Sequence, residues 1–321
     1  MAKKYDVVSV GSATVDCFVR LPVDFNNIRH GSKVLIDDIK LLTGGGGGNV
    51  AVGLARLGLR TGFIAEVGED LSAHMIKHEM QQEHVDFIVK SHSRHLTAYS
   101  VVLEAKGKDR SILVYKGASS FLHPEEIPKD LDAGWFYFAS VVGTSFKTMD
   151  LLSGFAKRKK IKIFFNPSEY MITKGGKLIK DIVSATTIIS LNKEEAQSLT
   201  RCSSTNSDEL LKRLKSLGPE VCIITNGKEG VHAYDGKSFY FKRARKMDAV
   251  DTTGAGDAFG AGFLGGWILN ERLPQELRMN ISLKMGLLNS ESVISYVGAK
   301  RGLLHNNTMK KELGGYDAVH K

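Results

Sequence analysis

Short apolar runs alternate with segments of helical periodicity along most of the chain. Six runs have the length and composition of buried strands, at residues 7–10, 61–65, 135–138, 161–165, 187–190 and 221–225. Between them, apolar side chains recur at helical spacing, which predicts helices at 50–57, 73–83, 146–158, 194–199 and 208–217. Continuously apolar strands separated by helices predict a mostly parallel sheet covered on both faces. In such a fold, ligands bind beyond the carboxyl ends of the strands.

Two stretches depart from this alternation and predict a second, smaller sheet. Residues 32–42 and the pair 98–103 and 110–115 have extended character, and Lys106-Gly107-Lys108-Asp109 predicts a hairpin turn within the pair. We expect these segments to form a small sheet that projects from the main domain. Such a sheet could cover a binding site as a lid, or could contact a second subunit through its exposed face.

The composition is that of an ordinary globular protein, with 42% hydrophobic and 25% charged residues among 321. It excludes the disordered, collagen-like and coiled-coil classes. No apolar run reaches the ~18 residues of a membrane span, and Met1-Ala-Lys-Lys-Tyr-Asp leads into the first strand without a signal-peptide core. The three cysteines, Cys17, Cys202 and Cys222, form no CxxC, so no disulfide framework or zinc site is predicted. We therefore expect a cytoplasmic protein.

The formal net charge is +9, and the densest basic run is Lys157-Arg158-Lys159-Lys160-Ile161-Lys162. Nucleic-acid binding is one interpretation of this run, but no aromatic side chain interrupts it. A solvated helix end accounts for it better, because lysine is favourable at a helix C-terminus. The positive charge would still help to collect an anionic nucleotide.

The clearest chemistry lies in Asp251-Thr252-Thr253-Gly254-Ala255-Gly256-Asp257-Ala258-Phe259. Residues 239–241 and 249–250 before it are expected to be strand, and apolar side chains at helical spacing follow it. Free backbone N–H groups of Gly254, Ala255 and Gly256 at the helix N-terminus would form an anion site. Asp257 places a carboxylate beside that site, although it could also serve as a simple helix cap. An anion site with an adjacent base is what phosphoryl transfer to an alcohol requires.

Two segments near the N-terminus place polar groups after the first strand and before the first helix. Gly11-Ser12-Ala13-Thr14-Val15-Asp16 fails the dinucleotide fingerprint GxGxxG at Ala13 and Asp16, so an oxidoreductase gains little support. Asp16 can accept strong hydrogen bonds from sugar hydroxyls, or it can be an ordinary turn residue. The five glycines at 44–48, followed by Asn49, are typical of a flexible linker, but here they lead directly into a predicted helix.

Two later segments follow buried strands. Asn192 and Glu195 are spaced as a helix cap and its N3 glutamate. The loop Thr225-Asn226-Gly227-Lys228-Glu229-Gly230 follows the strand at 221–225. The chain has no Walker A motif here, because the GKS sequence at 236–238 is preceded by Val231 where a glycine is required, and 234–237 predicts a hairpin turn.

Together these segments resemble the ribokinase-like (PfkB) carbohydrate kinases over roughly residues 5–305. The string at 251–259 resembles the C-terminal signature of that family, and 44–49 resembles its N-terminal signature, a diglycine followed by asparagine. The resemblance implies a three-layer α/β fold with a mostly parallel central sheet and a small β-sheet lid. It also implies a kinase domain at 1–305, with lid segments inserted at 17–43 and 96–118, and a C-terminal tail at 306–321.

The same resemblance implies an ATP-dependent phosphotransferase acting on a hydroxymethyl group of a small, ribose- or hexose-like sugar. Asp257 would be the catalytic base, and Gly254, Ala255 and Gly256 would hold the transferring group. The positions that match the family's sugar site are Asp16, Gly44, Gly45, Asn49 and Asn166. Those that match its nucleotide site are Asn192, Thr225, Gly227, Gly230 and Asn289, the last in a helix and turn at 289–299. Glu195 would organise Mg²⁺ largely through water, and Asp251 and Thr253 match a monovalent-cation site that would hold K⁺.

The identity of the acceptor stays open at this point. Ribokinase-type members carry Lys where this chain has Gly46, and a ribose-binding Glu where it has Ala139-Ser140. The fructokinase-type string Asp-x-Asn-x-Arg is absent, and Asn166-Pro167 fits ribokinase-type members instead. A sugar is the expected acceptor, a nucleoside kinase is the alternative, and a non-catalytic sugar- or nucleotide-binding protein of the same fold is a second alternative. The expected partners are the sugar, ATP and a second copy of the chain through the lid sheet, with no nucleic acid and no membrane.

Overall fold

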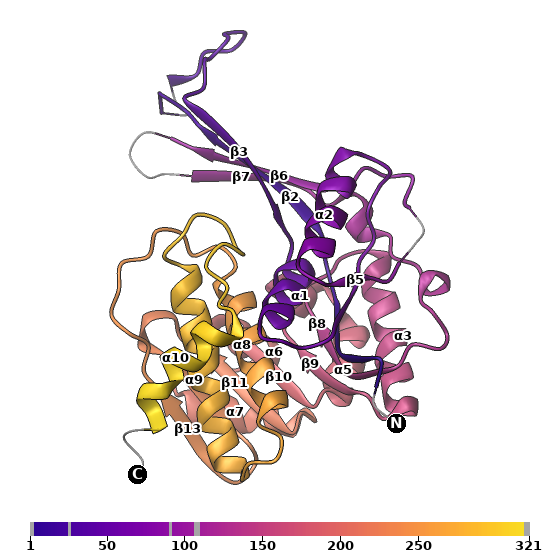
Figure 1. Cartoon of the computed structure of the whole chain (residues 1–321), viewed down its shortest axis with the longest axis vertical. Coiled ribbons are helices and arrows are strands. Elements are labelled where there is room, and N and C mark those ends of the chain that lie inside the picture. Colours follow the sequence, from indigo (N-terminus) through magenta and orange to yellow (C-terminus); the bar gives the residue numbers. More distant parts are fainter. Residues whose placement is uncertain (1–2, 25–26, 90–91, 106–109, 318–321) are drawn as a thin grey trace.

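A large sheet lies between two layers of helices in the computed structural model, which describes residues 3–24, 27–89, 92–105 and 110–317 (Figure 1). Seven of its nine strands run parallel, and the last two join one edge as antiparallel strands. The prediction of a mostly parallel sheet is confirmed. In spatial order the strands are β13 (Phe239–Lys242), β12 (Val231–Tyr234), β11 (Val221–Thr225), β10 (Ile188–Asn192), β9 (Lys162–Phe165), β8 (Ala133–Phe138), β1 (Tyr5–Val10), β4 (Thr61–Ile64) and β5 (Asp86–Phe87).

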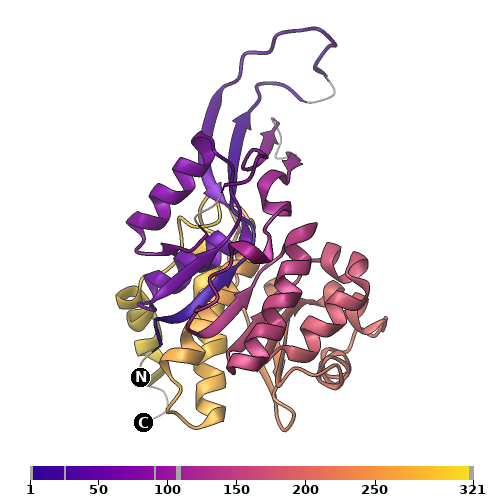
Figure 2. The same cartoon turned by 90° about the vertical axis from the view of Figure 1, so that its right-hand side faces the viewer.

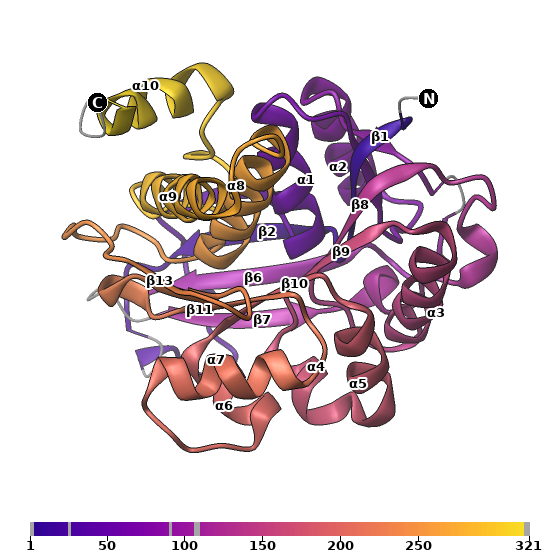
Figure 3. The same cartoon turned by 90° about the horizontal axis from the view of Figure 1, so that it is seen from below.

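Helices cover both faces of this sheet, as Figure 3 shows. One layer contains α1 (Gly46–Arg56), α2 (Leu71–Gln82), α8 (Ala255–Leu269), α9 (Gln275–Val293) and α10 (Asn306–Asp317). The other contains α3 (Thr144–Lys159), α4 (Glu169–Lys174), α5 (Gly176–Ala185), α6 (Lys193–Thr200) and α7 (Ser207–Ser216). The short 3-10 turns are η2 (Gly117–Ser120), η3 (Pro124–Glu126) and η4 (Gly227–Glu229).

Successive residues of the central strands point to opposite faces and enter separate cores. On β8, Phe136 packs toward α3, whereas Tyr137 packs with Phe164 and Phe263 toward α8. Because both faces are buried, the strands are apolar without interruption, and this is why their positions were predictable. The basic run also lies where it was expected, since α3 ends at Lys159 and Lys160 has the left-handed conformation of a helix cap.

A second sheet of four strands projects beyond the body, as Figures 1 and 2 show. Its order is β3 (Asp38–Gly44), β2 (Thr14–Arg20), β6 (Ala98–Glu104) and β7 (Arg110–Tyr115). The predicted pairing of β6 with β7 is confirmed, while the predicted turn at 106–109 lies outside the described residues. We call these four strands the lid. Strand β2, which carries Asp16, was not predicted, because that segment was interpreted as a turn after β1.

Two other expectations differ from the structure. Residues 249–250, expected to be strand, form an irregular loop in which Val250 is 64% exposed, because no neighbouring strand pairs with them. The predicted C-terminal tail contains α10. The expectation of a helix that includes residue 289 and a turn that follows it is confirmed, since α9 ends at Val293 and a turn follows. Within the described ranges, the helices are all too short or too polar to cross a membrane.

Candidate active site

Two glycine-rich helix starts meet at the centre of the molecule. Helix α1 begins at Gly46, inside the glycine run, and α8 begins at Ala255; the two helices pack against one another. Across this contact, Asn49 Nδ2 donates a hydrogen bond to Asp257 Oδ2 at 2.8 Å. The structure therefore brings together the predicted base and a predicted sugar-site residue that lie 208 positions apart in the sequence.

The first glycine run is shaped by close contacts within the protein itself. Gly45 has φ 88°, a conformation that favours glycine. A Cβ atom at Gly47 would lie 2.7 Å from the Cα of Gly11, where α1 packs onto the end of β1. A Cβ atom at Gly46 would lie 3.2 Å from Asp257 Oδ1. The glycines thus let α1 begin next to both β1 and the base, four residues earlier than the sequence predicts.

The second glycine turn differs at one position. Gly254 has φ 77°, and its Cα faces Ala299 so closely that no side chain would fit. Gly256 is exposed, has no positive φ, and has no atom within 4 Å of the place where a Cβ would lie. Packing within the described residues therefore does not require glycine at 256. The first N–H groups of α8 lack intrahelical partners, so this open position leaves room for an anion close to the backbone.

Asp257 lies in the first turn of α8 beside that open position. Burial raises the pKa of its carboxyl above the ordinary value, while the Asn49 hydrogen bond and the positive charge of Lys300 act in the opposite direction. A carboxylate with a raised pKa accepts a proton more readily at neutral pH than an ordinary aspartate does. This geometry and this charge balance are compatible with the predicted role of Asp257 as a general base.

Asp16 lies at the base of the lid on β2. Ser100 Oγ of the neighbouring strand β6 donates a hydrogen bond to Asp16 Oδ1, and Oδ2 lies against Gly44. Burial raises the pKa of Asp16, and the Ser100 hydrogen bond and the charge of Lys300 oppose this. Gly44 thus leaves room for the carboxylate at the end of the predicted sugar site.

Asp251 joins the lid to the turn that precedes α8. Arg110 Nη1 of β7 contacts its Oδ1 at 2.8 Å, and Thr253 Oγ1 donates to the same oxygen at 2.7 Å. Gly298 N donates to Oδ2 at 3.1 Å. Burial alone would raise the pKa of Asp251, but these hydrogen bonds lower it below its usual value. The two residues predicted for a monovalent cation therefore lie together, with an arginine on the carboxylate.

A cavity of about 790 Å³ lies between the lid and this turn. Its lining includes Arg20, Glu104 and Arg110 of the lid and Asp251 and Thr252 of the turn. A cavity of this size suits a small-molecule ligand.

The predicted nucleotide residues gather at the carboxyl ends of β10 and β11. Asn192 and Glu195 form a reciprocal capping pair at 2.7 and 2.9 Å, and Asn192 pairs in register with Thr225. Burial, together with the nearby Glu169 and Glu194, raises the pKa of Glu195, whose backbone hydrogen bond from Asn192 opposes the rise. Gly227 has φ 48° and open space around it, whereas Gly230 packs tightly against the backbone of Lys242.

Two predicted residues make hydrogen bonds inside the protein. Asn166, after β9, donates to Ser190 O at 2.7 Å and so links the ends of β9 and β10. Asn289 is fully buried in α9; its Nδ2 donates to Ala258 O and its Oδ1 accepts from Leu304 N. A side chain enclosed in this way can serve a nucleotide site only by holding α8 in place.

Sequence reasoning missed two charged residues of this region. It placed Arg110 in the extended segment 110–115 without assigning it to the site, and it did not consider Lys300, whose charge acts on both Asp16 and Asp257. No local pattern distinguishes either residue, because each reaches the site from a distant segment. Their roles become visible only when the lid and the turn after α9 are placed beside the two glycine turns.

Comparisons with known proteins agree with this arrangement. The family model described as pfkB family carbohydrate kinase matches residues 4–301. The chain is 32% identical over 244 residues to a fructokinase of Salmonella typhimurium, covering 71% of this chain and 77% of that protein. It is 25% identical over 318 residues to an ATP-dependent 6-phosphofructokinase of Thermoanaerobacterium thermosaccharolyticum, covering 96% and 94%. The solved structure of Arabidopsis thaliana ribokinase complexed with ribose and ATP has a TM-score of 0.82 at 22% identity, covering 98% of this chain and 99% of that one. The predicted ribokinase-like fold is confirmed.

Proposed function

We propose, from the premise that this chain belongs to the pfkB family of carbohydrate kinases, that it transfers the γ-phosphoryl group of ATP to a hydroxymethyl group of a small sugar. The observation that carries the proposal is Asp257, which Asn49 holds beside the open helix start at Gly256. A base adjacent to an anion site is the arrangement that phosphoryl transfer to an alcohol needs.

In the proposed reaction, the acceptor hydroxyl lies against the Asp257 carboxylate. As its oxygen forms a bond to the γ-phosphorus, the bond to the β-phosphate oxygen breaks, the hydroxyl proton passes to Asp257, and ADP leaves. The N–H groups of Gly254, Ala255 and Gly256 would stabilise the charge on the transferring group. Positioning and electrostatics of this kind supply most of the catalysis in such reactions.

The sugar would lie between the lid and α1. Asp16 and Asn49 would hydrogen-bond its hydroxyls, and the backbone at Gly44 and Gly45 would allow a close approach. Asn166 would complete this side of the site from the end of β9. The nucleotide would extend from Gly256 toward the ends of β10 and β11, where Asn192, Thr225, Gly227 and Gly230 would contact it, while Asn289 would act through α8.

The residues around Glu195 suit Mg²⁺. Its half-buried carboxylate has Glu169 and Glu194 nearby, and no lysine or arginine is among the groups that shift its pKa. The described residues contain no cluster of three or more metal-ligating side chains, and Mg²⁺ commonly binds through water and substrate phosphates instead. When bound, Mg²⁺ would neutralise charge on the triphosphate. A K⁺ ion at Asp251 and Thr253 would share the carboxylate with Arg110.

We also propose that two copies of the chain associate through their lids. The outer strands expose Ile112 (49%), Leu113 (59%) and Val114 (53%) on β7, and Ile39 (56%) and Leu41 (49%) on β3. Leu41 and Leu113 lie in register across the sheet through Cys17 and Val101, so exposed apolar side chains stand at both edges of one face of the lid. Exposed apolar side chains gathered on one face are typical of an interface. We expect sedimentation velocity to detect a dimer that Leu113→Arg dissociates, while Leu151→Arg on α3, at 57% exposure, leaves it intact. If the two variants had the same oligomeric state, the lid would not form the interface.

ADP release, coupled to an indicator reaction over a panel of acceptors, tests the proposed function. Turnover with pentoses or hexoses supports it, and turnover only with nucleosides supports the alternative of a nucleoside kinase. Because Arg20 and Arg110 line the cavity beneath the lid, the panel includes sugar phosphates, whose phosphate arginine binds well. Binding of sugar and ATP without turnover would identify a non-catalytic protein of the same fold.

A further inference from the structure

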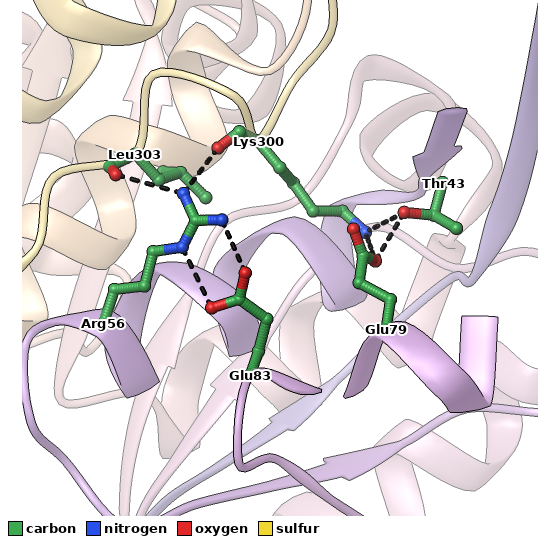
Figure 4. Close-up of polar contacts among 6 residues, drawn as sticks. All are labelled: Thr43, Arg56, Glu79, Glu83, Lys300 and Leu303. Carbon is green, nitrogen blue, oxygen red and sulfur yellow. Dashed lines mark hydrogen bonds and ion pairs between the residues drawn. The ribbon is translucent and has the colours of Figure 1, made fainter. Parts of the chain in front are cut away.

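A buried lysine lies at the junction of the lid, helix α2 and the turn after α9. The side chain of Lys300 is 7% exposed, and its Nζ donates to Thr43 Oγ1 at 2.8 Å and contacts Glu79 Oε2 at 2.5 Å. Figure 4 shows this cluster beside a second ion pair, Arg56 with Glu83. Thr43 belongs to β3 at the base of the lid, so the ammonium group joins three segments that are far apart in the sequence.

Lys300 lies directly beneath the glycine run. Its Nζ is 3.9 Å from the place where a Cβ of Gly48 would lie, and the next residue, Asn49, holds Asp257. Thr43, its hydrogen-bond partner, precedes Gly44, which packs against Asp16. The glycine run carries no side-chain charge of its own, and Lys300 brings one to it from the other end of the chain.

The residues before Lys300 contact the turn at 251–254 that precedes α8, which we call the catalytic turn. Gly298 N donates to Asp251 Oδ2, and Ala299 packs against Gly254. Arg56 Nη1 fixes the turn after α9, because it donates to the carbonyl oxygens of Lys300 and Leu303 at 2.9 and 3.1 Å (Figure 4). Three consecutive residues therefore contact Asp251, the start of α8 and the lid base in turn.

The placement of this charge is not explained by stability alone. Removing an ammonium group from water costs free energy that a single ion pair does not reliably recover. Lys300 is nevertheless kept near two carboxylates, Asp16 and Asp257. Burial raises the pKa values of both carboxyl groups, and the charge of Lys300 opposes that rise. A function in holding those two groups would account for the cost.

We propose that Lys300 is a positioning residue of the active site, whose ammonium group ties the lid base to the catalytic turn and places a positive charge beneath the glycine run that leads into Asn49. The inference rests on the proposed function, since it gives Asp257 the role of base. The other groups that face Lys300 are Glu79 of α2 and Glu83, the C-cap residue of that helix. Asp257 is also near Asn49 and the buried Tyr137, and Asp16 is near Ser100, Lys116 and Asp251.

The pH profile of kcat/KM tests this proposal with a matched pair of variants. Glu79→Gln and Glu83→Gln make the same chemical change on α2 and at its C-cap, but only Glu79 pairs with Lys300. Glu79→Gln removes the carboxylate that opposes the lowering of the pKa of Lys300 by burial, so the charge beside Asp257 changes and the acid limb of the profile moves. Glu83→Gln lowers the melting temperature and moves the limb less, because Glu83 pairs with Arg56. Equal shifts in both variants would overturn the proposal.

Removal of the charge fixes the sign of the shift. Lys300→Met moves the acid limb of the profile to higher pH and lowers kcat/KM on that limb by about 10-fold. This loss is smaller than the loss expected when a group that touches the reacting atoms is removed. Lys300→Arg restores the wild-type limb. An unchanged limb in Lys300→Met would contradict the proposal, and if that variant does not fold, the Glu79→Gln and Glu83→Gln pair still decides.

A titration of the Asp257 carboxyl by ¹³C NMR separates this inference from the proposed function. The signal, assigned by its loss in Asp257→Asn, titrates at higher pH in Lys300→Met and at a changed pH in Glu79→Gln whether or not an acceptor turns over. Absence of turnover in the wild type would contradict only the proposed function. Identical titrations in all three proteins would contradict only the role of Lys300.

Discussion

The two glycine-rich helix starts look alike in the sequence but have different physical causes. In the first, Gly45 has a positive φ and Gly47 has the backbone of Gly11 within contact distance, so the fold itself excludes side chains. In the second, Gly254 is excluded from carrying a side chain by Ala299, but Gly256 has only open space beside it. Contacts among the described residues therefore explain the first turn, whereas they do not require glycine at position 256, where we propose that a phosphate approaches.

This difference separates stability from activity within a single site. Residues that shape the first turn should affect folding when changed, and Gly256 and Asp257 should affect the reaction. The predictions below test that separation, in decreasing order of the expected effect.

Replacement of the base has the largest expected effect. Asp257→Asn keeps the shape of the side chain but cannot accept the proton, so kcat falls by about 10²–10⁴-fold while ATP binding, measured by calorimetry, stays near normal. Because burial raises the pKa of Asp257, its ionised form destabilises the fold at pH values above that pKa. The variant should therefore melt at or above the wild-type temperature at neutral pH. Unchanged turnover would remove Asp257 as the base.

The two glycines at the centre of the comparison give the next effect. Gly256→Ala places a methyl group in the open space where a phosphate would approach, so kcat/KM for ATP falls by about 10²-fold. Gly47→Ala instead forces a methyl group against Gly11 and Phe63 and costs about 1–3 kcal/mol of unfolding free energy. Chemical denaturation and steady-state kinetics on both variants check this. A loss of stability in Gly256→Ala together with a loss of activity alone in Gly47→Ala would contradict the comparison.

The hydrogen bond between the two helix starts controls the pH dependence. Asn49 donates to Asp257 and so favours its ionised form. Asn49→Ala raises the pKa of Asp257 further, and the acid limb of the kcat/KM profile moves to higher pH. Activity is lost as pH falls through this pKa, because the protonated base cannot accept the substrate proton. A limb that moves to lower pH would show that Asn49 does not stabilise the carboxylate.

The contact of the lid with the catalytic turn gives the smallest effect. The Arg110 side chain is 38% exposed, and ion pairs that reach solvent contribute about 0–1 kcal/mol. Arg110→Gln should raise the KM of the acceptor about two- to fivefold with little change in kcat, and should make activity more sensitive to the replacement of K⁺ by a larger cation. Arg20→Gln, which lines the same cavity but does not contact Asp251, is the matched variant and leaves the cation response unchanged.

The sequence predicted the sheet and its helices because both faces of the strands are buried, which makes their apolar runs continuous. It was less informative where a strand is partly exposed. In β2, the apolar residues Val15, Cys17 and Val19 alternate with Asp16, Phe18 and Arg20, and Asp16 suggested a turn. It was misleading at residues 249–250, whose apolar side chains lie in a loop with no strand beside them. Apolar character alone predicts a strand only where a neighbour can pair with it.

Within the site, the groups carried by the glycine motifs were predictable and the groups that hold them were not. Asp257, Asn49 and Gly256 follow from local patterns that open helices. Lys300 does not, because the contact between its Nζ and Thr43 joins positions 257 residues apart. Asn289 was assigned to the nucleotide, but its buried amide links α8 to Leu304. Long-range contacts of this kind depend on how the segments pack.

The melting temperature of Gly256→Ala, measured by calorimetry with and without ATP and Mg²⁺, tests the central claim most directly. Alanine has a higher helix propensity than glycine and meets no neighbour here, so the variant alone should melt at or above the wild-type temperature. The rise in melting temperature that ATP gives the wild type should be absent or much reduced. A full ATP-induced rise in Gly256→Ala would contradict the account, because the open space beside Gly256 would then not be where the phosphates bind.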